Sequence, residues 1–313
     1  VAEDINAEAI TRIKSSKDHI NGAIVTEDYI RTYTNPGFAT HVLGRVGQIS
    51  SDEYEKNKSN GYGINDIIGK QGIERWAEKY LRGKDGVSGA YADIGGEKVE
   101  LSAEKEAVPG NYVMLTIDSE LQKTLEESLE NTIKNIGNDC DSGGAVVLDV
   151  NSGDTLALAS YPTYDMSQFS EIYSELINNK SNPMLNRAVS GLYSPGSTYK
   201  PLTAIAAIQS GVVKPREMIT CTGIYDYYKD YQPSCWIWSE YHATHGHQDV
   251  TLAIENSCNV YFYELGRRLG IDKLDEYAKK FGLGEYTGIE LTEETSGHMA
   301  SPEYKEQVVA NVT

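Results

Sequence analysis

Residues 192–211 read LYSPGSTYKPLTAIAAIQSG, and the interpretation of the whole chain starts from them. Ser197 and Lys200 stand three residues apart, a spacing that puts both side chains on one face of a helix and lets a hydroxyl meet an amine. Pro195 and Gly196 predict a turn just before that helix. The small apolar residues that follow predict a helix that is buried on most sides and ends at Gly211.

The pair formed by Ser197 and Lys200 is a weak signal by itself, because a serine three residues before a lysine is expected about once in a chain of this length. A lysine near the start of an apolar helix is nevertheless unusual, since the helix dipole disfavours cations there and long charged side chains are seldom buried. The same surroundings would lower the pKa of Lys200, so that its neutral amine could take the proton of Ser197 Oγ.

A second motif lies about sixty residues further on, where residues 255–262 read ENSCNVYF and contain Ser257 and Asn259. Ser-x-x-Lys followed by Ser-x-Asn resembles the motif set of penicillin-binding proteins and class A β-lactamases. The runs SPGSTYKP, SCNVYFYELGRRLG and FGLGEYTGIEL resemble the transpeptidase domain of class B penicillin-binding proteins of the elongation and sporulation type. Upstream, HVLGRVGQIS and GINDIIGKQGIERWAEKYLRG resemble the non-catalytic pedestal domain of that family.

This resemblance implies an α+β fold, in which an antiparallel sheet with helices forms the transpeptidase domain. We expect a pedestal domain of the dimerisation type at residues 1–110 and a transpeptidase domain at residues 111–313, because the Pro-Gly pair at 109–110 separates a charged stretch from an apolar one. A helix capped by Asp118 or Ser119 and a hairpin over residues 143–161 agree with that fold.

The remaining elements are predicted from local patterns alone. We expect a short helix around residues 5–13, strands at 23–33, 41–49, 97–101 and 111–118, a polar loop or solvated helix at 50–63, a helix at 73–81, and a loop at 161–193. Asn186 and Arg187, in that last loop, are candidates either for lining a substrate groove or for a plain structural role.

Composition narrows the classes of function. The formal net charge of −18 argues against nucleic acid as a partner and against a basic patch for anionic lipids. No apolar run approaches the roughly 18 residues of a membrane span. The resembled family carries an N-terminal membrane anchor, so we expect the protein at the extracytoplasmic face of a bacterial cell membrane and the given chain to be trimmed. Four cysteines are too few for a disulfide scaffold.

Residues 212–250 combine two cysteines, three histidines and many aromatic side chains. One interpretation is an aromatic insertion with incidental cysteines or a disulfide between Cys221 and Cys235. The other is a structural zinc site with the closed tetrahedral set Cys221, Cys235, His245 and Cys258. The spacing of these residues matches no short zinc-finger pattern.

The family resemblance favours zinc. The sequence resembles some elongation-type class B proteins that have a zinc site. In those proteins two ligands come from this insertion, a third is a histidine in a His-Gly-x-x-x-Val-Thr stretch, and the fourth is a cysteine inside the second motif. His245 and Cys258 match those places, with His242 and His247 as fallback ligands. We expect the metal to support the catalytic loop from behind, and Cys140 to be a free buried thiol.

The resemblance implies D,D-transpeptidation of peptidoglycan stem peptides ending in D-Ala-D-Ala. Ser197 would be the nucleophile, Lys200 its base, Ser257 a proton relay, and Asn259 the residue that holds the substrate amide and orients Lys200. The backbone N–H of Ser197 would supply one donor to the oxyanion. β-Lactams would acylate Ser197, and a membrane glycosyltransferase would be a partner.

The family's third motif, Lys-Thr-Gly or Lys-Ser-Gly, does not occur in the 313 residues. It normally supplies a carboxylate-binding lysine and the second oxyanion donor, so the given chain is expected to be a transpeptidase domain incomplete at its C-terminus, with weak or absent turnover. Rival functions are a D,D-carboxypeptidase and a serine β-lactamase, both disfavoured by the pedestal. A non-catalytic cell-wall scaffold or β-lactam sensor with the same fold is the alternative from another class.

Overall fold

The structure is a computed structural model that describes residues 5–15, 30–92, 99–137, 140–299 and 301–310. Its first elements are α1 (Ala7–Ser15), α2 (Thr40–Leu43), β1 (Val46–Gln48), α3 (Ser51–Asn57), β2 (Ile67–Gly69), α4 (Gly72–Trp76), α5 (Glu78–Leu81), β3 (Val87–Ala92) and β4 (Val99–Lys105). They are followed by α6 (Ser119–Ile136), β5 (Gly143–Leu148), β6 (Thr155–Tyr161), α7 (Phe169–Asn178) and α8 (Arg187–Ser190). The last are the 3₁₀ turn η4 (Gly196–Tyr199), α9 (Lys200–Gln209), β7 (Ile219–Cys221), α10 (Trp236–Tyr241), β8 (Gly246–Gln248), α11 (Val250–Glu255), α12 (Asn259–Leu269), α13 (Ile271–Lys280) and α14 (Pro302–Ala310).

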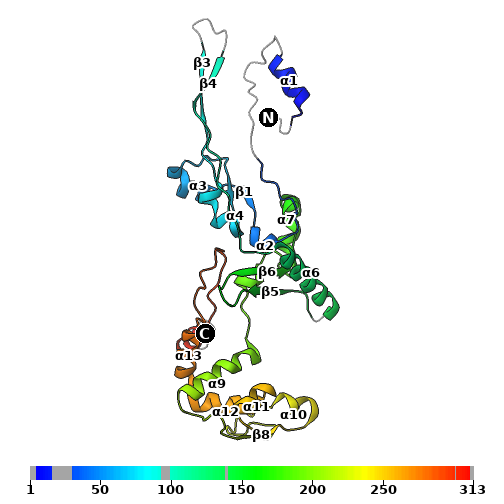
Figure 1. Cartoon of the computed structure of the whole chain (residues 1–313), viewed down its shortest axis with the longest axis vertical. Coiled ribbons are helices and arrows are strands. Elements are labelled where there is room, and N and C mark those ends of the chain that lie inside the picture. Colours follow the sequence, from blue (N-terminus) through cyan, green and yellow to red (C-terminus); the bar gives the residue numbers. More distant parts are fainter. Residues whose placement is uncertain (1–4, 16–29, 93–98, 138–139, 300, 311–313) are drawn as a thin grey trace.

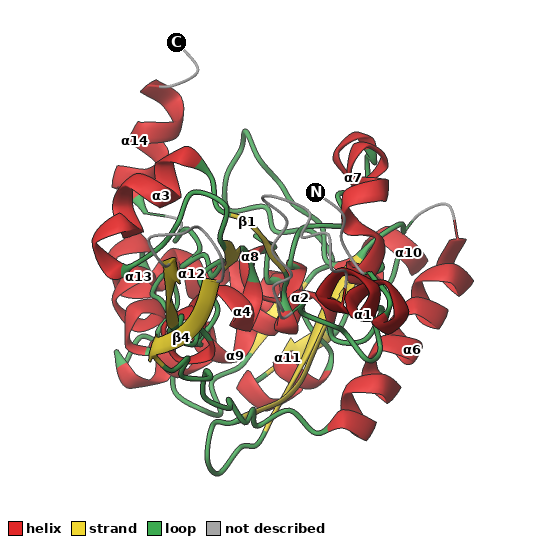
Figure 2. Cartoon of the chain, turned by 90° about the horizontal axis from the view of Figure 1, so that it is seen from above, coloured by secondary structure: helices red, strands yellow, loops and turns green. Residues whose placement is uncertain are grey.

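These elements form an elongated molecule, with the β3–β4 hairpin at one end and the helices around α9 and α12 at the other (Figure 1). The β5–β6 hairpin and α6 lie between the two ends. All four sheets of the described residues are two-stranded and antiparallel, pairing β1 with β2, β3 with β4, β5 with β6 and β7 with β8. Seen along the long axis, helices dominate and the strands are short separate ribbons (Figure 2). The expected α+β class is therefore confirmed.

The first part of the chain matches its predicted elements unevenly. Helix α1 and strand β4 occupy two of the predicted places, although residues 23–29 and 97–98 of the strand predictions lie outside the described residues. Residues 30–33 have no regular structure, and the strand predicted at 41–49 is instead the helix α2 followed by β1. The polar segment is the helix α3, which a capping box between Ser50 and Glu53 starts. The predicted helix 73–81 is divided into α4 and α5 at Ala77.

In the middle of the chain one predicted helix is confirmed, and the prediction of a strand is wrong. Helix α6 begins at its cap Asp118, whose side chain accepts from the N–H groups of Glu120 and Leu121. Residues 111–118 form no strand, because this segment makes only one backbone hydrogen bond to β6, from Asp118 N to Leu156 O at 2.9 Å. The hairpin of β5 and β6 is confirmed, with Gly143 opposite Tyr161.

The predicted loop at 161–193 is wrong, because it contains α7 and α8. Helix α7 places Phe169, Ile172 and Leu176 on one face, where they pack with Tyr164 and Met184. None of the helices in the described ranges has the length and apolar character needed to cross a bilayer.

Two apolar cores organise the elements that matter for function. The larger one surrounds α9 and α12, and its members include Ala206, Val213, Tyr261 and Leu265. A smaller core joins Ala39 and Val42 near α2 to Leu158 of β6 and to Leu291 near the end of the chain. The larger core fixes the position of the turn that carries Ser197.

Candidate active site

Ser197 lies in the 3₁₀ turn η4, directly before the buried helix α9. Gly196, with φ +59°, adopts a left-handed conformation that glycine tolerates. Helix α9 buries Ala204, Ala206 and Ala207 in the larger core, whereas Ser197 itself is exposed. The sequence placed Ser197 on the helix; the structure places it one turn earlier, on a short element anchored by the helix.

The second motif forms a tight turn between α11 and α12. Ser257 has φ +47°, which is a strained conformation for a residue other than glycine. The turn is held by the bond from Cys258 N to Ala253 O at 2.9 Å. Asn259 is the first residue of α12, so the side chains of Ser257 and Asn259 both meet Lys200 Nζ at the start of one helix.

The four predicted catalytic side chains come together in one hydrogen-bonded chain. Ser257 Oγ donates to Ser197 Oγ at 2.9 Å. Lys200 Nζ donates to Ser257 Oγ at 2.9 Å, to Ser257 O at 2.6 Å and to Asn259 Oδ1 at 2.7 Å. The structure has no hydrogen bond between the described side chains of Ser197 and Lys200, so their expected direct contact is replaced by a link through Ser257.

Lys200 occupies an environment suited to a base. Burial lowers the pKa of its amine, and the neighbouring Cys235 and Cys258 act in the opposite direction. A lysine that loses its proton more easily than usual is the kind of group that can activate a serine hydroxyl. The three acceptors around Nζ fix where that amine points.

Behind the second motif, four potential metal ligands gather within 4.8 Å of one another: Cys221, Cys235, His245 and Cys258. The three thiols are buried, and His245 Nδ1 lies 3.7 Å from Cys221 Sγ and 3.5 Å from Cys235 Sγ. Bond lengths of about 2.3 Å to sulfur and 2.0–2.1 Å to nitrogen would separate two tetrahedral zinc ligands by about 3.5 Å. The donors in this thiol cluster can therefore hold a metal ion of that kind.

The other cysteine and histidine expectations have mixed outcomes. All four cysteines are free thiols, so the disulfide between Cys221 and Cys235 does not form here. Cys140 is free as expected but only half-buried. The fallback ligands lie outside the cluster, because His242 Nδ1 contacts Trp238 O and His247 Nδ1 contacts Thr220 Oγ1.

The thiol cluster touches the catalytic motif directly. The backbone N–H of Asn259 donates to Cys235 Sγ at 3.3 Å, while the side chain of the same residue accepts from Lys200. Sequence reasoning placed only Cys258 behind the motif and missed this second contact. No local pattern signals it, since Cys235 is far from Asn259 along the chain.

Asn186 and Arg187 are structural rather than part of the cleft. Both are buried; Asn186 Nδ2 donates to His41 O, and Arg187 donates to Asn182 O and to Ser181 O. These bonds close the loop before α8. The alternative of a plain structural role fits their positions.

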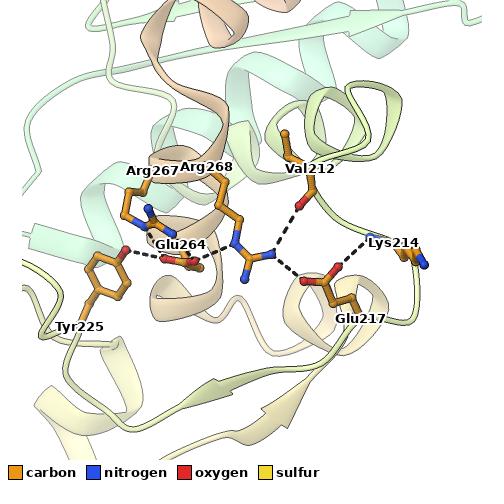
Figure 3. A network of polar contacts seen from close by, with 7 residues as sticks. All are labelled: Val212, Lys214, Glu217, Tyr225, Glu264, Arg267 and Arg268. Atoms are coloured by element: carbon orange, nitrogen blue, oxygen red, sulfur yellow. Dashed lines mark hydrogen bonds and ion pairs between the residues drawn. The ribbon is translucent and has the colours of Figure 1, made fainter.

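A polar network supports α12 from its other end (Figure 3). Glu264 accepts from Tyr225 Oη at 2.7 Å, from two nitrogens of Arg267 at 2.8 Å and from Arg268 Nε at 2.7 Å. These donors, Arg267 foremost, lower the pKa of Glu264 to about 2. Sequence reasoning did not single out this network, although Glu264 stands three and four residues before the two arginines, the spacing of helical ion pairs.

Comparison with known proteins places this arrangement in a family. Residues 143–313 match the penicillin-binding protein transpeptidase domain, and residues 1–115 match the penicillin-binding protein dimerisation domain. The chain belongs to the class B penicillin-binding proteins. The expected family is thus confirmed.

Several relatives of this class B penicillin-binding protein match along most of its length. Peptidoglycan D,D-transpeptidase MrdA of Salmonella typhimurium (strain LT2) is 32% identical over 96% of the chain and 48% of the relative. Stage V sporulation protein D of Bacillus subtilis is 31% identical over 89% of the chain and 39% of the relative. The chain therefore spans about half the length of the curated relatives that it matches, or less.

Solved structures agree with the same fold. The penicillin-binding protein PBP2 of Helicobacter pylori, in a complex with MreC, matches with a TM-score of 0.76 and 28% identity over 89% of the chain and 51% of that protein. Pseudomonas aeruginosa PBP2 in complex with WCK 5153 matches with a TM-score of 0.67 and 30% identity, over 87% of the chain and 54% of that protein.

Proposed function

We propose that this class B penicillin-binding protein is a serine D,D-transpeptidase that crosslinks peptidoglycan stem peptides. The observation that supports it most is the continuous chain of hydrogen bonds from Ser197 through Ser257 to Lys200 and Asn259. Such a chain joins a nucleophile to a base whose position is fixed by a third group. The relatives named peptidoglycan D,D-transpeptidase support the same activity.

The proposed reaction begins when Ser197 Oγ attacks the carbonyl of the penultimate D-Ala. With Lys200 neutral, both hydrogen bonds reverse, so that the hydroxyl proton of Ser197 passes to Ser257 Oγ while the proton of Ser257 passes to Lys200 Nζ. The bond to the terminal D-Ala breaks, and the leaving amine takes a proton back through Ser257. An amine from a neighbouring strand then attacks the acyl-enzyme and restores Ser197.

Two further groups assist this reaction. Asn259 Oδ1 keeps the Lys200 amine directed at Ser257, and its amide can also meet the substrate backbone. The backbone N–H of Ser197, at the start of the helical segment, would donate one of the hydrogen bonds to the oxyanion. β-Lactams would react with Ser197 in place of the stem peptide.

The proposed activity is tested with the full-length protein, a stem peptide ending in D-Ala-D-Ala and an acceptor amine. We expect D-Ala release and a crosslinked product from the wild type, and neither from Ser197→Ala. Ser210→Ala, which removes a hydroxyl just beyond the other end of α9, should retain full activity and serves as the control. Product formation by Ser197→Ala at the rate of the wild type would contradict the proposal.

We propose in addition that the thiol cluster binds one structural zinc ion through Cys221, Cys235, His245 and Cys258. The donor set and the 3.5–3.7 Å separations of sulfur from Nδ1 support this choice. The ion would fix Cys258 and Cys235, the two cysteines that contact Asn259. Cys258 precedes that residue in the chain and Cys235 Sγ accepts its N–H, so the catalytic turn would be held from behind.

Elemental analysis of natively purified protein tests the zinc proposal. About one zinc per chain is expected in the wild type and in Cys140→Ser, because Cys140 lies outside the cluster. Cys258→Ser should lose most of the metal, and chelation should lower the melting temperature of the wild type and of Cys140→Ser but not that of Cys258→Ser. Absence of zinc from the wild type would contradict the proposal.

We place the protein at the extracytoplasmic face of the bacterial cell membrane, with a pedestal at residues 1–110 and the transpeptidase part at 111–313. A membrane glycosyltransferase is the proposed partner. The match to a structure titled for the coordination of polymerization and crosslinking by a peptidoglycan synthase complex, with a TM-score of 0.73, supports that partner. The relatives include both MrdA and stage V sporulation protein D, so wall elongation and sporulation are the two settings that fit.

A further inference from the structure

Four tyrosine rings lie in contact next to the second motif, and we call them the tyrosine row: Tyr263, Tyr225, Tyr227 and Tyr228. The ring centres of Tyr263 and Tyr225 are 5.8 Å apart, those of Tyr225 and Tyr227 6.3 Å, and those of Tyr227 and Tyr228 4.9 Å. Tyr225 is buried beneath the others. Tyr227 and Tyr228 keep 57% and 50% of their surface exposed, and Tyr263 keeps 37%.

The tyrosine row is held in place before any ligand arrives. Tyr225 Oη donates to Glu264, and the guanidinium of Arg267 lies 4.3 Å from the ring centre of Tyr227. Arg267 is itself fixed by two hydrogen bonds to Glu264, which Figure 3 shows. Exposed aromatic rings that are already ordered lose little conformational freedom on binding, which is a property of recognition surfaces.

The tyrosine row begins beside the catalytic residues. Tyr263 follows Asn259 by four residues on α12, so both side chains project from one face of the helix, one turn apart. From Tyr263 the row continues away from Lys200 through the loop that contains Tyr227 and Tyr228. A ligand group bound on the row would thus lie beside, and not inside, the reaction centre.

The chemistry of the row selects among ligands. Ring faces bind flat surfaces of C–H groups, and phenol hydroxyls can exchange hydrogen bonds with other hydroxyls. Asp226 and Asp230 offset the charges of Lys229 and Arg267 around the exposed rings. The net charge of −18 on the chain disfavours polyanions and anionic lipid surfaces. An uncharged polyhydroxylated ring system, such as a saccharide, fits both features.

We propose that the tyrosine row is a saccharide subsite, which binds the glycan strand whose stem peptide reacts at Ser197. Arg267, which lies against the ring of Tyr227, follows Asn259 by eight residues on α12, or about 12 Å along the helix axis. An extended peptide of four residues reaches about 14 Å. The sugar end of a stem peptide bound at Ser197 can therefore reach the exposed rings. This inference rests on the proposed transpeptidase function.

The test compares the full-length wild type with the double variant Tyr227→Ala/Tyr228→Ala. The substrates are stem peptides attached to a short glycan and the same peptides without sugar. We expect KM for the glycan-linked substrate to rise about 10-fold in the variant, as the loss of two aromatic contacts implies. Turnover of the free peptide and acylation by a β-lactam should stay unchanged. Tyr286→Ala, which removes an exposed tyrosine outside the row, is the control.

A second measurement separates this proposal from the proposed function. Direct titration with a peptide-free glycan oligosaccharide should show binding to the wild type and to Ser197→Ala, and about 10-fold weaker binding to the double variant. Equal losses for glycan-linked and free substrates would mean a structural role and would overturn the saccharide subsite. Loss of crosslinking in cells without any saccharide binding would assign the row to a protein partner and would overturn it as well. Failure of acylation with intact saccharide binding would refute only the proposed function.

Discussion

Lys200 is held by three oxygen atoms at once, and its behaviour as a base depends on two opposed influences. Burial favours the neutral amine, whereas the neighbouring Cys235 and Cys258 favour the ammonium. The pKa of Lys200 is lowered, so burial prevails. More of the free base is then available near neutral pH than for an exposed lysine.

This lowered pKa predicts the pH dependence of acylation. Because only the neutral amine can accept a proton, the rate of acylation by a β-lactam should rise with pH and level off above the pKa of Lys200, with an inflection below 10.5. Lys200→Arg should acylate slowly and without that inflection, because arginine stays protonated. Lys214→Arg should keep the profile of the wild type. An inflection at or above 10.5 would refute the role of burial.

At the scale of single residues, the sequence predicted which side chains would matter but not how they connect. The spacing of Ser197 and Lys200 suggested a direct bond, yet the left-handed backbone of Ser257 inserts its hydroxyl between them. That conformation is unusual for serine, so no propensity indicates it. The same limit explains the missed contact between Cys235 Sγ and the N–H of Asn259.

Among the elements, α6 was predicted correctly as a helix, but the residues that it buries differ from those that its apolar pattern indicates. Leucines and isoleucines recur along α6 at helical spacing as far as Ile136, yet Ile136 is exposed and Gln122 is fully buried. The amide of Gln122 donates to Leu158 O and accepts from Leu158 N, both at 2.7 Å. It thus pairs with β6 as a neighbouring strand would. Hydrophobic periodicity cannot detect a polar side chain in that role.

Replacement of Gln122 by methionine tests this pairing. Methionine has similar volume but leaves the N–H and C=O of Leu158 without partners, so we expect the free energy of unfolding to fall by about 2–4 kcal/mol. Urea denaturation of the full-length protein measures the loss. Gln209→Met, at an exposed position at the end of α9, should change stability by at most about 0.5 kcal/mol. Equal effects of the two substitutions would contradict the pairing.

Other elements differ from prediction for reasons of tertiary context. Residues 111–118 alternate like a strand, but Tyr112 and Met114 remain exposed and the segment does not join the sheet. Helix α7 has apolar residues at helical spacing, a pattern from which the helix could have been predicted. The flanking prolines and asparagines of residues 161–193 concealed it.

For the molecule as a whole, the N-terminal part and the rest of the chain are packed together. Ala39 and Val42 share a core with Leu158 and Leu291, and Gly72 N donates to Glu293 Oε1 at 2.9 Å. The family resemblance anticipated two parts, but contacts between residues so distant in the chain cannot be deduced from local patterns. The boundary at residue 110 stays a prediction.

The segment at the predicted boundary, residues 109–111, is itself packed against α5. Asn111 N donates to Tyr80 O at 2.8 Å, and a Cβ added to Gly110 would lie only 1.8 Å from Leu81 O. Glycine is therefore required there for close approach of two backbone segments. A packed junction of this kind gives the catalytic end a defined position relative to α5.

The measurement that tests the central claim most directly is the intact mass of the full-length protein after reaction with a β-lactam. We predict a single adduct with the mass of one β-lactam, assigned to Ser197 by peptide mapping and absent from Ser197→Ala. Folding of that variant is checked by its melting temperature. Folded wild-type protein that gains no adduct, or an adduct that persists in Ser197→Ala, would contradict the assignment of Ser197 as the nucleophile and with it the proposed transpeptidase mechanism.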